Sequence, residues 1–226
     1  MVEYDNLKLV FSTLWSHINP VSRVDGLKYW QSEYSILENT KEKELPGASR
    51  HQGDLGMKTA LFFTRLIHND IAVAGASSCQ WWTALSRADF KDGLIYLDDG
   101  TNNGSMAEGY CKNDGFFRES KLLWALGNYS YFVRPGMVRV ALSDTEEKKD
   151  SNALMFKDTA KRKIVIVAVN TTDTEQFCRL KMDKFKIKDL TPYTTSENAN
   201  LTKGKAIKGE HFKVPGKAVF TYRGEY

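Results

Sequence analysis

The sequence contains no long hydrophobic run and no block of charge of one sign. No apolar stretch is long enough to cross a bilayer, and the start, Met1–Asp5, lacks the basic and then apolar pattern of a secretory signal. The net charge is only +4, and basic residues alternate with acidic ones. Nucleic-acid-binding proteins usually concentrate positive charge on one face. We therefore expect no membrane span and no nucleic-acid partner.

Cysteine and histidine are scarce and scattered. Cys79, Cys111 and Cys178 are widely separated, and the four histidines show no metal-ligand spacing. A zinc site needs closely spaced Cys or His pairs, and the aspartates between 89 and 99 lack the spacing of an EF-hand loop. We expect no metal site and no cofactor. The thiols are interpreted as buried or idle, with one disulfide left open as an alternative in an exported protein.

The composition is that of a folded protein, with 42% hydrophobic and 12% aromatic residues. The pattern changes once, near Arg134–Gly136. Residues 1–133 alternate between helix-like and strand-like segments, which predicts βα units and a parallel sheet. Residues 134–226 contain short strands separated by turns, which predicts a β-sandwich. The fold class is therefore α/β followed by all-β.

Hydrophobic periodicity and turn residues place the elements. Helices are expected over 8–18, 55–74 and 120–133, strands over 27–37 and 76–85, and loops over 38–53 and from 86 through 115. Later strands are expected over 137–142, 153–158, 163–170, 176–182, 187–193, 213–214 and 218–222. The strand 163–170 is apolar on both faces, which is typical of a central strand. Two βα units cannot form a stable parallel sheet alone, so the first part is expected to be the end of something larger.

Glu33 is a candidate catalytic carboxylate, because it ends a predicted strand between Trp30 and Tyr34. Retaining glycoside hydrolysis needs two carboxyl groups about 5–5.5 Å apart. From spacing alone, a solvated loop glutamate is the better interpretation. Trp81 and Trp82 lie on opposite faces of the next predicted strand. One of them would face a ligand and the other a helix, unless both belong to the core.

Several motifs in the same order resemble glycoside hydrolase family 30. Residues 27–34, LKYWQSEY, are similar to the family's seventh barrel strand, and Gln80–Trp82 with 89–96 to its eighth strand and following loop. Residues 124–137 resemble the last barrel helix and the entry into the side β-domain, to which 165–170, 191–196 and 220–222 are similar.

The resemblance implies the last units of a (β/α)8 TIM barrel followed by a β-sandwich side domain. It implies a retaining hydrolase of β-linked glycans with Glu33 as nucleophile. Trp81 is the first choice and Trp82 the second for the aromatic that stacks on substrate, and Tyr34 and Trp30 are further substrate contacts. The Trp-Trp strand and residues 92–96 look most like the endo-β-1,6-galactanase branch. The β-glucosidase, β-1,6-glucanase and xylanase branches stay open.

The family's acid/base glutamate lies on the fourth strand, usually within an Asn-Glu-Pro run, and this sequence has no such run. We therefore expect a catalytically incomplete chain that self-associates through the open barrel edge. The parent is expected to be extracellular or periplasmic, where polymeric glycans are usually degraded. The alternative is a non-catalytic carbohydrate-binding or structural β-domain with a vestigial barrel remnant. An unrelated two-domain binding protein is a third alternative, which would leave the ordered motifs unexplained.

Overall fold

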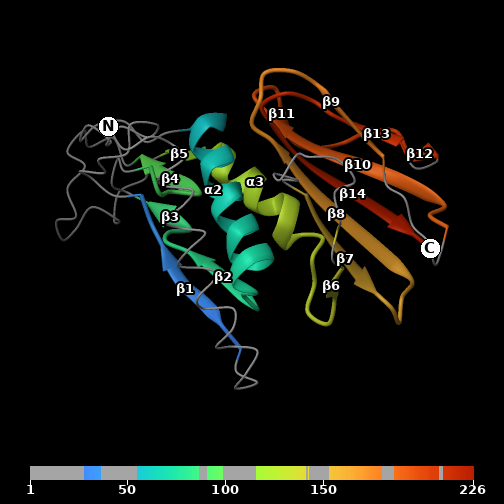
Figure 1. Cartoon of the computed structure of the whole chain (residues 1–226). Coiled ribbons are helices and arrows are strands. Elements are labelled where there is room, and N and C mark those ends of the chain that lie inside the picture. The colour runs from blue at the N-terminus through green and yellow to red at the C-terminus, as the bar shows by residue number, and fades with distance from the viewer. Residues whose placement is uncertain are drawn as a thin grey trace, which may run out of the picture.

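The structure is a computed structural model that describes residues 28–36, 55–86, 91–98, 116–140, 142, 153–179, 186–208 and 211–226. Two helices, α2 (Met57–Asn69) and α3 (Lys121–Ser130), form its middle layer. Short strands lie on one side of these helices, and a large C-terminal sheet lies on the other (Figure 1). The helix predicted over 8–18 and the loop predicted over 38–53 lie outside the described residues.

The helix predicted over 55–74 is confirmed, but its last turn is a π-helix, η1 (Asp70–Ala74). Its buried side chains include Ala60, Phe63 and Ile67, which follow the three- and four-residue spacing of one helical face. Gly75 ends the segment at a φ of 71°, in the left-handed region that glycine adopts without steric cost.

Strands β1 (Trp30–Tyr34) and β2 (Ser78–Trp81) pair in parallel and are joined through α2. Both are shorter than the strands predicted over 27–37 and 76–85. The register runs from Trp30 opposite Ser78 to Tyr34 opposite Trp81, and it shifts between Gln31 and Tyr34. One additional residue therefore stands in β1, which is the geometry of a β-bulge.

A three-stranded sheet occupies part of the segment that the sequence predicts as a loop, so that prediction is wrong for β4. The sheet consists of β3 (Leu85–Ser86), β4 (Ile95–Asp98) and β5 (Phe116–Glu119). The many Gly and Asp residues hide a short apolar run around Tyr96, which is 1% exposed. A Cβ at Gly93 would lie 2.8 Å from the Ser86 Cβ and 2.9 Å from the Tyr96 ring, so this close packing requires glycine.

The C-terminal sheet has the strand order β11-β10-β14-β8-β7-β6, and β12 also pairs with β10. A two-stranded sheet of β9 and β13 is separate from it. The structure adds β11 and β12, which the sequence analysis missed. The bounds are β6 (Val138–Val140), β7 (Ala153–Asp158), β8 (Lys163–Asn170), β9 (Gln176–Arg179), β10 (Asp189–Ser196), β11 (Ala199–Lys203), β12 (Ile207–Lys208), β13 (His211–Val214) and β14 (Ala218–Glu225).

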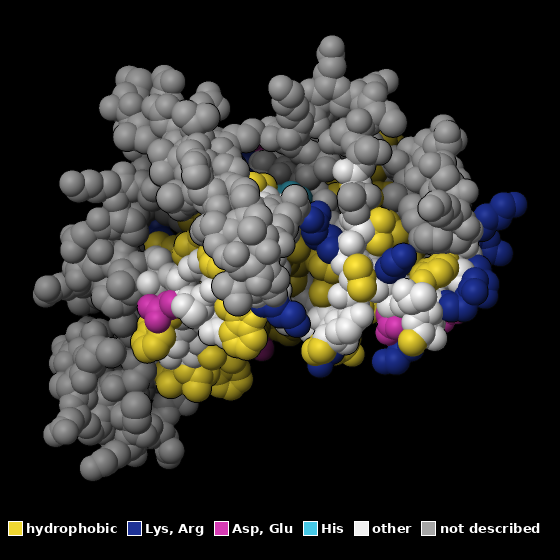
Figure 2. Space-filling view, turned by 60° about the horizontal axis from the view of Figure 1, so that its bottom comes forward, with side chains coloured by type: hydrophobic (Ala, Val, Ile, Leu, Met, Phe, Trp, Pro, Cys, Tyr) yellow, Lys and Arg dark blue, Asp and Glu magenta, His cyan; other side chains and the backbone are white. Residues whose placement is uncertain are grey.

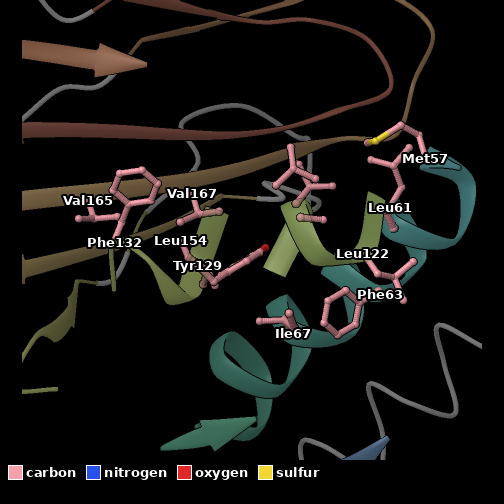
Figure 3. Packing of buried hydrophobic residues seen from close by; sticks show 14 of the residues in the cluster. Met57, Leu61, Phe63, Ile67, Leu122, Tyr129, Phe132, Leu154, Val165 and Val167 are labelled. Carbon is pink, nitrogen blue, oxygen red and sulfur yellow. The ribbon is translucent and has the colours of Figure 1, made fainter. Parts of the chain in front are cut away.

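The prediction that β8 is a central strand is confirmed, since Lys163–Asn170 pairs with β7 and β14 and is buried on both faces. Val165 and Val167 pack with residues of α2 and α3 in one cluster (Figure 3). Ile164 and Ile166 pack with Phe212 of β13 in a second cluster on the opposite face. The helix layer thus shares its core with the large sheet.

A buried polar group joins α3 to the same sheet. The Asn128 side chain is fully buried, and its Nδ2 donates to Thr221 Oγ1 at 2.9 Å and to the Tyr193 carbonyl at 3.2 Å. Its Oδ1 accepts a 2.6 Å hydrogen bond from Thr195 Oγ1. Thr221 Oγ1 donates in turn to the Asn128 carbonyl at 2.7 Å. This network determines where α3 lies on β10 and β14.

Replacing Asn128 should be costly because its partners would remain buried without hydrogen bonds. We expect Asn128→Ala to lower the free energy of unfolding by about 2–4 kcal/mol, measured by urea denaturation. The exposed Asn198 provides a control of the same residue type. A loss for Asn128→Ala no larger than that for Asn198→Ala would show that the network contributes little.

His68, on the last turn of α2, is largely buried, and its Nδ1 has no hydrogen-bond partner among the described residues. Burial, together with the positive charges of Arg139 and Arg65, lowers the pKa of His68 from 6.5 to about 4. The folded state therefore binds this proton less readily than the unfolded state does. The stability that neutral His68 contributes is complete above pH 6.5 and is lost as the pH falls toward 4.

We expect the parent chain to lose more stability than His68→Gln between pH 7 and pH 5. The difference in the free energy of unfolding should be about 2 kcal/mol, measured by urea denaturation at both pH values. The exposed substitution Asn198→Ala leaves every histidine in place and should retain the parent's pH dependence. Equal pH dependence of the parent and His68→Gln would contradict the assignment.

Candidate active site

The face of the β1–β2 pair that is turned away from α2 is here called the open face, and it carries Glu33. Tyr34 and Trp81 are register partners, and both pack against the small cluster around Leu66 and Ala74 on the helix side. Because side chains alternate along strands, we expect Glu33 of β1 and Trp82, which directly follows β2, on the other face. Both are exposed, as is Trp30 at 60%. The bulge in β1 adds Ser32 to this exposed set.

Trp81 and Trp82 differ sharply in environment. The Trp81 ring packs against Phe63 of α2 at a centroid distance of 4.5 Å, and its Nε1 donates to the Asp92 carbonyl at 2.6 Å. Trp82 is 52% exposed. The structure therefore favours Trp82 over Trp81 as the aromatic that is free to stack on a ligand. This is the reverse of the order expected from the sequence, which could not assign the face of either ring.

The two strands meet at the position that bears Glu33. The Trp82 backbone N–H donates to the Tyr34 carbonyl at 2.8 Å, so the ends of β1 and β2 are held side by side. Gln31 Nε2 donates to the Glu33 carbonyl at 2.9 Å, and Tyr29 Oη donates to Gln31 Oε1. Gln31 is thus a positioning residue for the backbone of Glu33 that sequence reasoning missed. The sequence offered one signal for this role, a polar residue two positions before the carboxylate at the end of the strand.

Asp92 organises the loop that follows β2. It is 2% exposed, and burial raises the pKa of its carboxyl, although Ser86 Oγ donates to Asp92 Oδ1 at 3.2 Å. Its carbonyl accepts from Trp81 Nε1 and from the Thr83 N–H at 3.2 Å. These bonds determine how the chain turns away after Trp82, where the peptide bond to Thr83 is cis.

A cavity of about 80 Å³ lies on the helix side of the strands and is lined by Asp70, Cys79 and Trp81 among others. Burial and the neighbouring Asp70 carboxylate raise the pKa of the Cys79 thiol far above its usual range. The thiol is therefore neutral and unsuited to nucleophilic attack. Burial also raises the pKa of Tyr29. This side of the sheet packs behind the open face.

Catalytic residues of parallel barrels sit at the carboxyl ends of strands, which is where Glu33 stands in β1. Within β1 and β2 no other Asp or Glu is present. The described part of the chain contains no group of three His, Cys, Asp or Glu able to hold a metal ion. None of its helices is long and apolar enough to cross a membrane.

Sequence comparison relates this region to known enzymes. The profile of a family described as O-glycosyl hydrolase family 30 matches residues 15–96, which include β1, α2 and β2. Glucuronoxylanase XynC of Bacillus subtilis (strain 168) is 29% identical over 118 residues, covering 50% of this chain and 27% of that enzyme. The matched half of the chain thus covers about a quarter of this relative.

Solved structures resemble nearly the whole chain. A conserved exported protein from Bacteroides fragilis has a TM-score of 0.75 and 29% identity, covering 95% of this chain and 43% of that one. A family 30, subfamily 8 xylanase from Clostridium acetobutylicum has a TM-score of 0.65 and 17% identity, covering 92% and 45%. The family model and the curated relative thus relate this chain to glycoside hydrolase family 30, and the solved structures share its fold.

Replacing Trp81 or Trp82 by alanine should have different effects on stability. Trp81→Ala removes the Phe63 contact and the hydrogen bond to Asp92, and should lower the free energy of unfolding by about 3 kcal/mol. Trp82→Ala should change it by no more than about 0.5 kcal/mol. Urea denaturation measures both, and equal losses would contradict the assignment of Trp81 to the core and Trp82 to the open face.

Proposed function

We propose that this chain is the C-terminal part of a retaining glycoside hydrolase, with Glu33 as its nucleophile. The observation that carries the proposal is an exposed carboxylate at the carboxyl end of a parallel strand. Side-chain alternation directs it to the same face as Trp82, and both side chains are exposed. The family 30 profile match includes both residues.

In this reaction the Glu33 carboxylate attacks the anomeric carbon and displaces the leaving oxygen, which forms a covalent glycosyl ester. A second carboxyl group protonates the leaving oxygen and afterwards takes a proton from the water that cleaves the ester. We assign that second group to a barrel strand outside this chain. In the complete site it would stand about 5–5.5 Å from the Glu33 carboxyl group.

Trp82 and Trp30 provide flat apolar surfaces on the open face, at 52% and 60% exposure. Such rings suit a sugar, whose C–H groups pack on the aromatic face while its hydroxyl groups stay solvated. Tyr34 supports them from the helix side of the sheet. Trp81 acts indirectly, as a packing residue behind the face.

β-1,6-Galactan is the substrate we propose, because the Trp-Trp strand and residues 92–96 resemble the galactanase branch. Xylan is the competing substrate, since named relatives are xylanases. A parent enzyme that releases oligosaccharides from xylan and none from galactan would replace this assignment while leaving the role of Glu33 intact.

The remaining barrel strands would pair with the β1 edge and cover the apolar side chains near it. Exposed large residues in the described chain include Trp30, Leu85, Phe116 and Phe117. An uncovered strand edge with such residues promotes association, so the isolated chain should self-associate. The parent would act outside the cytoplasm, which agrees with the description of one structural relative as a conserved exported protein.

A second candidate function is a non-catalytic carbohydrate-binding or structural β-domain. This sequence has no Asn-Glu-Pro run, which agrees with such a domain. The sequence upstream in the same reading frame distinguishes the two functions. An upstream Asn-Glu-Pro strand supports the hydrolase, and its absence supports the remnant.

Glu33→Gln in the complete parent should lower kcat on β-glycan by a factor of about 10⁴ or more, because the amide cannot form the glycosyl ester. Reducing-sugar release measures this loss. Glu197→Gln replaces an exposed glutamate in the β10–β11 turn and should leave kcat unchanged.

The isolated chain should release no sugar from the same substrates, since it lacks the acid. Undiminished turnover by the Glu33→Gln parent would remove Glu33 from the nucleophile role. Robust hydrolysis by the isolated chain would refute the assignment of the acid to an absent strand.

A further inference from the structure

A second concave site lies where α3 ends over the large sheet. It is a cleft of about 240 Å³ between the α3–β6 connection and strands β7, β8 and β14. Four cationic side chains and one acid line it, together with two aromatic residues and two aliphatic ones. The lining residues are Tyr131, Phe132, Arg134, Met137, Asp158, Lys161, Lys163, Val165 and Arg223.

Strand register brings the cations to one side of the sheet. Lys163 is opposite Asp158 of β7, and Val165 is opposite Arg223 of β14. Partners in register share a face, and residues two apart along β8 share it too. Arg134 reaches the same place from the helix end, where its Nη1 donates to the Ser130 carbonyl at 2.8 Å.

The acid in the cleft is already engaged. Asp158 Oδ1 accepts from the Lys161 backbone N–H at 3.0 Å, and Asp158 Oδ2 lies 3.9 Å from Lys161 Nζ. Glu225 is opposite Lys163 in the β8–β14 register but is outside the cleft lining. The positive charges of Arg134, Lys163 and Arg223 therefore exceed the negative charge of the lining. Figure 2 turns the lower side of Figure 1 forward and shows Lys and Arg side chains gathered where the C-terminal sheet lies.

An aromatic surface accompanies these charges. Tyr131 is 69% exposed, and its ring meets Phe132 edge-on at a centroid distance of 5.0 Å. Phe132 is buried against Tyr193 at 4.5 Å, so it supports Tyr131 from the core. The cleft is smaller than the roughly 300–1,000 Å³ of pockets for drug-sized ligands, which suits a single ring.

The cleft lies at the end of the helix layer opposite Glu33. The Ser77 N–H donates to the Tyr29 carbonyl at 2.8 Å, so the chain leaving α2 and η1 lies at the start of β1. The Lys121 N–H donates to the Leu55 carbonyl, and Tyr129 Oη donates to the Thr64 carbonyl, so α3 runs in the same direction as α2. The end of α3 is therefore remote from the carboxyl ends of β1 and β2.

We propose that this cleft is a glycan-binding site for one anionic sugar residue, with Tyr131 stacking on the ring. Arg134, Lys163 and Arg223 bind the carboxylate or sulfate group, because guanidinium groups form paired hydrogen bonds with such oxyanions. The choice of a sugar rests on the proposed glycan-directed function, whereas the anion preference rests on the cleft alone. A site there would hold an acidic polysaccharide at a distance from the reacting bond.

Binding of the unmodified chain is measured by affinity electrophoresis on glucuronoxylan, on the same polymer after reduction of its carboxyl groups, and on a sulfated galactan. We expect retardation by glucuronoxylan and little by the reduced polymer. Retardation by the sulfated galactan as well assigns the site to anionic sugars in general, and its absence assigns it to uronates. Equal retardation by the native and the reduced polymer would overturn the proposal.

The triple variant Arg134→Gln, Lys163→Gln, Arg223→Gln should weaken binding to glucuronoxylan about tenfold or more. Tyr131→Ala should weaken it about three- to tenfold. The control Lys203→Gln, Lys205→Gln, Lys208→Gln removes the same charge from exposed positions at the β11–β12 edge. Urea denaturation checks that each variant is folded.

Equal weakening by the two triple variants would show a general charge effect and overturn the site. Because binding needs no catalysis, its loss in the cleft variant leaves the Glu33 test unaffected. Conversely, Glu33→Gln could leave the kcat of the parent unchanged while the cleft variant still lost binding. That result would refute the role of Glu33 and leave the binding site in place.

Discussion

The packing of α2 and α3 between two sets of strands is the constraint on which the rest of the structure depends. The cluster that contains Phe63, Leu122 and Tyr129 continues into Val165 and Val167 of the large sheet, so one core serves both sides (Figure 3). Trp81 joins this cluster from β2. Any shift of the helix layer would therefore move both the strand ends that bear Glu33 and the cleft beneath α3.

Polar interactions make that packing specific. Apolar contacts alone would tolerate small slides of α3 over the sheet, but the Asn128 amide must satisfy donors and acceptors on β10 and β14 simultaneously. On the other side, Gln31 and Asp92 determine the backbone at the ends of β1 and β2. The open face is thus built on a rigid layer, as precise chemistry requires.

Local pattern was enough to predict α2, α3 and the doubly buried strand β8, because each contains a long, regular apolar repeat. It failed for β4, whose apolar run is short and lies among Gly and Asp residues. It also placed Glu33 at a strand end, but the faces that Glu33 and Tyr34 take depend on a bulge in β1 that no local signal marks. The Asn128 network joins residues 65 or more positions apart, and the cationic cleft brings Arg134, Lys163 and Arg223 together from separate elements. A reading of local pattern could therefore find neither.

The central claim is that Glu33 forms the covalent bond to the sugar. A 2-fluoro glycoside with a good leaving group, incubated with the complete parent enzyme, should trap the glycosyl ester, because fluorine slows its hydrolysis. Peptide mass spectrometry should then find the sugar on the peptide that contains Trp30–Tyr34, at Glu33. A stable label on any other carboxylate would contradict the account.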